Sequence, residues 1–246
     1  CTAQVLLAVM AGMYAVYHGP RGLKFIANKV NNSAAALSKA LKDLGIEQTN
    51  AYFFDTIQIK ADAVKTKYEA EKKEVNFHYP DTNTVTISIN ETTSISDLNE
   101  IISIFEKVTE TTTSPIETLE TNDTIPDHLQ RETEFLTLDV FNSYHSETEL
   151  MRYIKRLERK DLALNQSMIS LGSCTMKLNA AAEMLPLSWN RWGNIHPFAP
   201  KSQTKGFEFF LKKLENQLKE ITGFSATSLQ PNSGAQGEYA GLMTIR

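Results

Sequence analysis

The spacing of apolar residues changes sharply about one fifth of the way along the chain. From Pro20 to Leu44 they recur every three or four positions, which is typical of an amphipathic helix that begins at a proline and ends before Gly45. Short β-prone runs then follow, at residues 52–59, 75–79 and 85–89. A chain with both periods must pack a helix layer on a sheet layer. The expected fold class is therefore α/β, as an α+β domain with helices on a small, mostly antiparallel sheet.

Two further helices and one long connection complete this predicted domain. A polar-faced helix is expected over residues 62–73, and Ser96 is expected to cap another that carries Leu98 and Phe105 on its apolar face. Residues 109–123 are rich in Thr and Glu and offer little to bury. They are predicted to form a linker or an ordered surface connection, with a domain boundary nearby.

The first 17 residues are strongly apolar, yet they do not resemble a signal peptide or a membrane span. They lack a basic start, include Thr2 and Gln4, and reach His18-Gly19-Pro20 before the roughly 20 residues that a span needs. An apolar helix of this kind is expected in a core or at a subunit contact. Because the chain starts at Cys1 and stops at Arg246 inside a predicted helix, we expect an internal fragment.

Composition narrows the class of protein. A chain of 246 residues that is 41% hydrophobic, with net charge −4, is expected to be globular and not to bind nucleic acid. Cys1 and Cys174 lie far apart, which favours a reduced, intracellular chain over a disulfide framework. No pair of histidines or carboxylates has metal-ligand spacing, so no metal site is predicted.

A glycine-containing turn near the end of the chain is typical of an anion site. In Gln230-Pro231-Asn232-Ser233-Gly234-Ala235-Gln236-Gly237, Ser233 can cap a helix while the two glycines leave backbone N–H groups accessible. An ordinary tight turn is the commoner explanation of such a pattern. The sequence lacks a Gly-Lys-Ser/Thr motif and a dinucleotide fingerprint, so a cofactor with one phosphate fits better than a triphosphate.

A second polar loop, Gly172-Ser173-Cys174-Thr175-Met176-Lys177-Leu178-Asn179, allows three roles. Cys174 could be a nucleophile, Lys177 a Schiff-base lysine, or Ser173 and Thr175 hydrogen-bond donors. A lone cysteine among small residues is more often an inert thiol, and a lysine in a polar loop is more often solvated. The role of Ser173 and Thr175 as hydrogen-bond donors requires the fewest further conditions. His145 and His196 are further candidates, although histidines at a helix entry or in a turn commonly bond local backbone.

Five runs of the sequence, taken together, are similar to those of a known family. They are Tyr144-His145-Ser146-Glu147-Thr148-Glu149, Leu157-Glu158-Arg159-Lys160-Asp161, Leu171-Gly172-Ser173-Cys174-Thr175-Met176-Lys177-Leu178-Asn179, His196-Pro197-Phe198 and Gln230-Pro231-Asn232-Ser233-Gly234-Ala235-Gln236-Gly237-Glu238-Tyr239. These runs resemble the decarboxylating glycine dehydrogenases, which are the P-proteins of the glycine cleavage system. The resemblance is weakest over residues 47–135 but extends along nearly the whole chain.

The resemblance implies an enzyme with two halves, each similar to aspartate aminotransferase, of which one keeps pyridoxal 5'-phosphate. Residues 1–108 would then be the small domain of the first half, 109–140 a linker, and 141–246 the start of the cofactor-binding half. The phosphate would be held by the Ser233 hydroxyl and by backbone N–H groups at Gly234, Ala235 and Gln236, with Gly237 leaving room. The glycine pocket would include Ser173, Cys174, Thr175, Asn179, His145 and His196.

In this family glycine condenses with the cofactor and loses CO₂, and its aminomethyl group passes to the lipoyl group of the H-protein. The implied partners are therefore glycine, lipoylated H-protein and the remaining half, in a homo- or heterodimer. The compartment would be the cytoplasm in a bacterium or the mitochondrial matrix in a eukaryote. The family's Schiff-base lysine lies downstream of Arg246, and Lys177 does not take its place, so the isolated chain is expected to be inactive and to bind cofactor weakly. A non-catalytic assembly module is the alternative.

Overall fold

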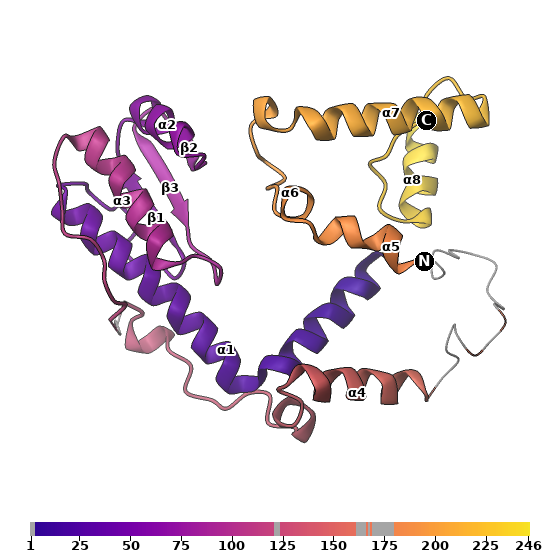
Figure 1. Ribbon diagram of the computed structural model, residues 1–246, viewed down its shortest axis with the longest axis horizontal. Helices are drawn as coiled ribbons and strands as arrows, with labels where there is room; N and C mark the ends of the chain where they lie inside the picture. The colour runs from indigo at the N-terminus through magenta and orange to yellow at the C-terminus, as the bar shows by residue number, and fades with distance from the viewer. Residues whose placement is uncertain (1–2, 121–123, 161–165, 167, 169–179) are drawn as a thin grey trace. The chain divides into compact units, whose positions relative to one another are not determined.

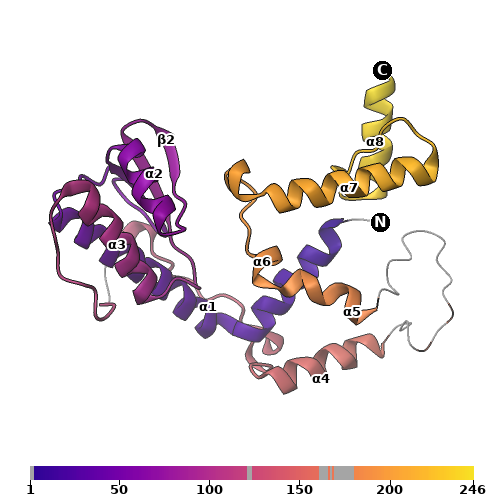
Figure 2. The ribbon, with the colours of Figure 1, turned by 45° about the horizontal axis from the view of Figure 1, so that its top comes forward.

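The computed structural model describes residues 3–120, 124–160, 166, 168 and 180–246. The described residues form two units, one made of Ala15–His145 and the other of the residues before and after that stretch. Figure 1 labels the α-helices and strands, and Figure 2 shows the same ribbon turned by 45°. Each unit is described by itself.

The first helix, α1, runs from Ala3 to Asp43 and is broken at Gly19, whose backbone leaves the helical region (φ 58°, ψ −177°). Pro20 opens the second part, as the sequence predicted. The expected apolar stripe of that part is buried, with Val30, Leu37, Leu41 and Leu44 in the core. The helix ends two residues before Gly45, which takes a left-handed conformation (φ 79°).

A three-stranded antiparallel sheet follows, in the order β1-β3-β2, and this confirms the predicted antiparallel arrangement. Its strands are β1 (Thr56–Lys60), β2 (His78–Asp81) and β3 (Thr84–Ser88). Ile57 pairs with Ile87 and Ile59 with Val85, so one face of β1 and β3 is buried. β1 begins four residues later than predicted, because only residues 56–60 pair with β3.

Two helices pack with the sheet around one apolar core. They are α2 (Ala63–Lys72), capped by Asp62, and α3 (Ile95–Thr109). The prediction that Ser96 caps α3 was wrong: Ser94 is the N-cap, because Asp97 three residues later completes a capping box with it. The core draws on α1, β1, β3 and α3, with Phe105 and Leu98 fully buried.

The described part of the Thr- and Glu-rich connection, residues 109–120, is held along the surface of this domain. Asn99 holds it with two hydrogen bonds. The Asn99 Nδ2 donates to the Ile116 carbonyl oxygen (2.9 Å), and the Asn99 Oδ1 accepts the Ile116 N–H (2.8 Å). Ile116 and Leu119 pack against the core. Thr124 then donates to Oδ1 of the buried Asn31 at 2.8 Å. We call the described residues 110–120 and 124 the strap. Two short 3₁₀ turns, η1 (Asp127–Leu129) and η2 (Asp139–Asn142), follow it.

The second unit contains helices but, among its described residues from 146 onward, no buried side chain. Its predicted helix signals hold: Ser146 caps α4 (Glu147–Glu158), and Gly223 (φ 73°) ends α7 (Lys205–Thr222). Residues 227–229, which read as strand-like, form no strand. The other elements are α5 (Ala181–Met184), η4 (Leu185–Ser188), α6 (Asn190–Gly193), η5 (Lys201–Gln203) and α8 (Gly234–Ile245).

The resulting architecture is rich in α-helix with one small antiparallel sheet, which agrees with the α/β class. Within the described part of the chain, no helix has the length and apolar character needed to cross a membrane.

Candidate functional site

The glycine-containing turn forms the N-terminus of α8, as the sequence predicted. Ser233 is the N-cap, with extended backbone (φ −154°, ψ 165°), and its Oγ accepts the Gln236 N–H at 3.4 Å. The Gln236 side chain folds back, and its Oε1 accepts the Asn232 N–H at 2.8 Å. These two hydrogen bonds are made within the chain, so the turn is held without a ligand.

Two backbone N–H groups at this helix start have no acceptor within the described part of the chain, those of Gly234 and Ala235. They lie on exposed residues. The Ser233 Oγ acts as an acceptor toward Gln236, so its own proton remains available for donation. A helix start of this kind offers N–H groups and a partial positive charge to an anion.

The glycines of the turn are not required by backbone strain. Gly234 and Gly237 are not among the glycines with positive φ. A Cβ on Gly234 would meet nothing within 4 Å, and one on Gly237 would lie 3.9 Å from the Pro231 Cβ. Among the described residues, no neighbouring atom therefore excludes a side chain at these two positions.

His145, predicted as a pocket residue, is held by its own unit. Its Nδ1 lies 2.7 Å from the Tyr17 carbonyl oxygen. Its ring lies against Gly19, so closely that a Cβ there would come within 2.7 Å of the His145 Cε1. The ring thus packs on the break in α1, and its direction is set by that contact.

His196, the other predicted histidine, is held by a local turn. Its Nδ1 accepts the Phe198 N–H at 3.1 Å, and its ring lies 5.8 Å from that of Phe198. Nearby, Trp192 makes edge contacts with Phe207 at 4.8 Å and Phe210 at 5.5 Å, from centroid to centroid. Aromatic packing therefore joins α6 to the start of α7.

The remaining predicted pocket residues, Ser173, Cys174, Thr175 and Asn179, lie outside the described residues, as does Lys177. Among the residues that are described, no group of three His, Cys, Asp or Glu side chains could hold a metal ion.

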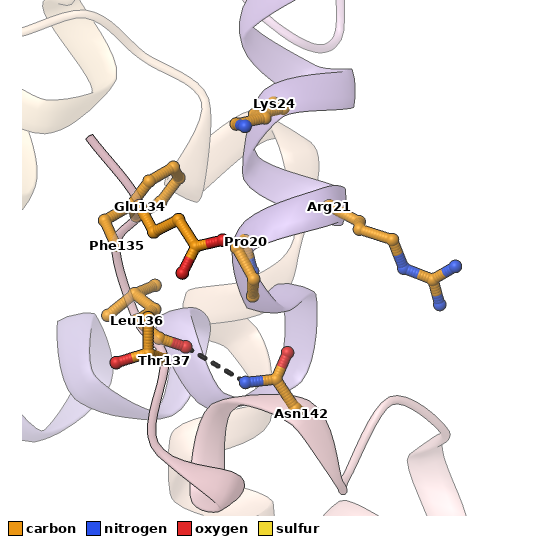
Figure 3. Close-up of a pocket in the computed structure, with 8 residues that line it drawn as sticks. All are labelled: Pro20, Arg21, Lys24, Glu134, Phe135, Leu136, Thr137 and Asn142. Carbon is orange, nitrogen blue, oxygen red and sulfur yellow. Dashed lines mark hydrogen bonds between the residues drawn. The ribbon is translucent and has the colours of Figure 1, made fainter. Parts of the chain in front are cut away.

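A hollow of about 460 Å³ lies in the Ala15–His145 unit, where sequence reasoning placed no site. Figure 3 shows Lys24 on the second part of α1 near Phe135, with Arg21 extending away from them. The Lys24 Nζ lies 5.8 Å from the Phe135 ring centroid. The full lining is Pro20, Arg21, Lys24, Glu134, Phe135, Leu136, Thr137 and Asn142.

The segment that closes this hollow has strained backbone at Leu136, with φ 51°. Asn142 holds it, since its Nδ2 donates to the carbonyl oxygens of Leu136 (3.0 Å) and Leu138 (3.1 Å). None of the sequence-predicted site residues lines the hollow. The local sequence could not indicate this hollow, because the residues that face Arg21 and Lys24 across it, from Glu134 to Asn142, lie more than 100 positions further along the chain.

Comparison with known proteins tests the resemblance directly. Residues 1–105 match the family model described as glycine cleavage system P-protein. Over all 246 residues the chain is 67% identical to "Glycine dehydrogenase (decarboxylating)" of Christiangramia forsetii and 65% identical to that of Flavobacterium johnsoniae. The protein of the same name from Bacteroides thetaiotaomicron is 50% identical over 250 aligned residues.

Each of these alignments covers the whole of this chain but only 26% of the relative. The chain therefore spans about a quarter of the length of the curated relatives it matches. The predicted resemblance is confirmed: this sequence is similar, from end to end, to a segment of the glycine cleavage system P-protein.

Proposed function

We propose that this chain is part of a pyridoxal-phosphate-dependent glycine decarboxylase, which transfers the aminomethyl group of glycine to a lipoylated H-protein and releases CO₂. The observation that carries the proposal is the 67% identity to a glycine dehydrogenase over every residue of the chain. The geometry at α8 is compatible with it, because a helix start with accessible N–H groups suits the cofactor's phosphate.

The residues of the turn fit a monophosphate. The Gly234 and Ala235 N–H groups lack protein acceptors in the described structure, and the space beside Gly234 is open. The Ser233 hydroxyl can donate its proton to a phosphate oxygen. The Gln236 N–H, also proposed as a donor, is engaged by Ser233 at 3.4 Å, a length at which a charged acceptor would compete effectively.

The proposal assigns separate roles to the cofactor and to the residues of this chain. When bound, the cofactor supplies an electron sink for decarboxylation of the amino acid. Ser233 and the first N–H groups of α8 anchor its phosphate and so orient it. Ser173, Cys174, Thr175, Asn179, His145 and His196 are the proposed lining of the glycine pocket. The lysine that tethers the cofactor is proposed to lie outside this chain.

The proposal extends to architecture and partners. Residues 1–108, 109–140 and 141–246 are proposed as the small domain of a first aminotransferase-like half, a linker, and the start of a cofactor-binding half. Glycine, lipoylated H-protein and the rest of the enzyme, as a homo- or heterodimer, are the proposed partners. The bacterial relatives favour a cytoplasmic enzyme over a mitochondrial one.

A chimeric enzyme tests the function. This chain would replace the matching segment of the Flavobacterium johnsoniae relative, and CO₂ release from glycine would be assayed with lipoylated H-protein. We expect activity, and we expect Ser233→Ala to weaken cofactor binding about 10- to 100-fold, since a hydrogen bond to a charged group is lost. Ser202→Ala, an exposed serine in η5, is the matched control. A folded chimera that binds cofactor but releases no CO₂ would refute the proposal.

One observation favours the alternative of a non-catalytic assembly module. The first part of α1 exposes an apolar surface that includes Val5, Leu6, Leu7 and Met10, each at least 58% exposed. Such a surface is typical of a protein contact. If the chimera assembled normally but remained inactive with cofactor bound, the assembly role would stand alone.

A further inference from the structure

The hollow beside the second part of α1 carries opposite charges on its two walls. Lys24 lies on the helix, with Arg21 one turn earlier at the edge, and Glu134 lies on the facing segment. Figure 3 shows the Glu134 side chain extending toward Pro20. Within the described part of the chain, none of the three charged groups forms an ion pair, either with one another or elsewhere. A cation and a carboxylate are therefore both open to a ligand.

The lining between these charges is apolar. The Phe135 ring lies there, with the Lys24 Nζ 5.8 Å and the Arg131 guanidinium carbon 5.2 Å from its centroid. Pro20 and Leu136 complete the apolar part. The volume of about 460 Å³ falls within the range of about 300–1,000 Å³ that is usual for small-molecule sites. An apolar group of a ligand can thus lie beside the charged side chains.

Contacts within the chain fix the shape of the hollow. The Asn142 Nδ2 donates to the carbonyl oxygens of Leu136 and Leu138 and so holds Leu136 at φ 51°. The same segment lies close on α1 at Gly19, where a Cβ would come within 2.5 Å of the Phe141 carbonyl oxygen. All of these residues belong to the Ala15–His145 unit. The hollow is therefore formed before a ligand enters it.

The charges select the class of ligand. A simple anion would be attracted by Lys24 and repelled by Glu134, and a simple cation would meet the reverse. A zwitterion can place its carboxylate at Lys24 and its ammonium group at Glu134, so that each charge has an opposite neighbour. We propose that the hollow binds a free α-amino acid whose apolar side chain lies against Phe135. This site goes beyond the proposed function, since none of the residues proposed to hold glycine or the cofactor's phosphate lines the hollow.

L-leucine is the probe for this site. Lys24 and Glu134 are exposed, and exposed ion pairs contribute little each, so we expect a dissociation constant of about 1 mM. Nuclear magnetic resonance of the backbone amides of the full chain, during titration with L-leucine, measures it. Saturable shifts should be confined to residues 21–24 and 134–142. The absence of a saturable shift, or shifts centred elsewhere, would overturn the proposal.

Three analogues test the parts of the ligand separately. Isocaproate is leucine without its amino group, and isoamylamine is leucine without its carboxylate. Each loses one ion pair and should bind about two- to fivefold more weakly than L-leucine. Glycine lacks the apolar side chain and should bind about fivefold more weakly or worse. Isocaproate that bound as tightly as L-leucine would make the hollow a plain anion site, and glycine that did so would refute the role of the apolar lining.

Two variants assign the charges. Lys24→Gln should weaken L-leucine and isocaproate about two- to fivefold and leave isoamylamine unchanged, whereas Glu134→Gln should weaken L-leucine and isoamylamine and leave isocaproate unchanged. Lys39→Gln, at an exposed position of the same helix outside the hollow, is the matched control and should change nothing. Unaltered amide resonances of β3 show that each variant is folded. Equal affinities in Lys24→Gln, Glu134→Gln and the control would refute the site.

Discussion

Residues 15–145 and residues 146–246 use similar helices with very different results. The first stretch encloses a core in which α3 buries five side chains, including Leu98 and Phe105. In the second, α7 is longer and also amphipathic, yet on its apolar side Phe210 is 48% exposed and Ile221 is 79% exposed. An apolar stripe stabilises a helix only when a second layer covers it. The first stretch contains that layer. In the second, Trp192 packs on the start of α7, but no side chain among the described residues from 146 onward is buried.

The largest expected effect comes from removing one aromatic ring from each region. Phe105→Ala should destabilise the first region by about 3–5 kcal/mol, because the ring is fully buried. Phe209→Ala in α7 should cost less than about 0.5 kcal/mol, because its ring is mostly solvated.

Hydrogen exchange of peptides from β3 and α3 measures the first change. Fluorescence reports separately on the second region, since both tryptophans, Trp189 and Trp192, lie there. Equal costs at the two positions would show that the second region has a core of its own and would break the comparison.

A smaller effect is expected where the strap is attached. Asn99→Ala leaves the N–H and carbonyl of Ile116 without their partners, so it should cost about 1–2 kcal/mol and free residues 110–120. Limited proteolysis within the strap is the measurement. Asn216→Ala, in α7, is the control and should not alter cleavage there. A strap that stays protected in Asn99→Ala would mean that Ile116 and Leu119 hold it by packing alone.

The smallest effect at neutral pH concerns Tyr79, on β2. Burial raises the pKa of its phenol to about 12, and the hydroxyl has no hydrogen-bond partner within the described chain. Because the folded-state pKa lies above the ordinary value of 10.0, this contribution to stability is complete below about pH 10 and is lost as the pH rises toward 12.

Tyr79→Phe should therefore be neutral or slightly stabilising at pH 7 and should reduce the loss of stability between about pH 10 and 12. Urea titrations across that range, followed by far-ultraviolet circular dichroism, measure it. Tyr239→Phe removes an exposed hydroxyl from α8 and serves as the control. An unchanged alkaline profile in Tyr79→Phe would assign the loss to other groups.

Features encoded by neighbouring residues were predicted well from the sequence. The stripe of α1, the caps at Ser146 and Ser233 and the stop at Gly223 each depend on a few adjacent positions. The α8 turn is of this kind, so its helix start could be anticipated. What a turn binds depends on the space in front of it, which the local sequence does not encode.

Features set by distant partners were missed or misplaced. Tyr52 and Phe54 have β-prone side chains, but they lie outside β1 because only residues 56–60 meet β3. The conformation of Gly19 depends on Phe141 and His145, more than 120 positions away. The strap was judged by its composition, whereas two apolar residues and one asparagine decide its course.

The buried amide of Asn31 has a consequence for synthesis on the ribosome. One half of its side chain is satisfied early, by the Phe54 carbonyl oxygen, 23 residues downstream. The Oδ1 accepts from Thr124, which lies 93 positions after Asn31 and therefore 70 positions after Phe54. At translation rates of about 5–20 residues per second, the 70 positions between Phe54 and Thr124 take roughly 4–14 s. During synthesis the buried Asn31 Oδ1 therefore lacks its Thr124 donor until residue 124 has emerged from the ribosome.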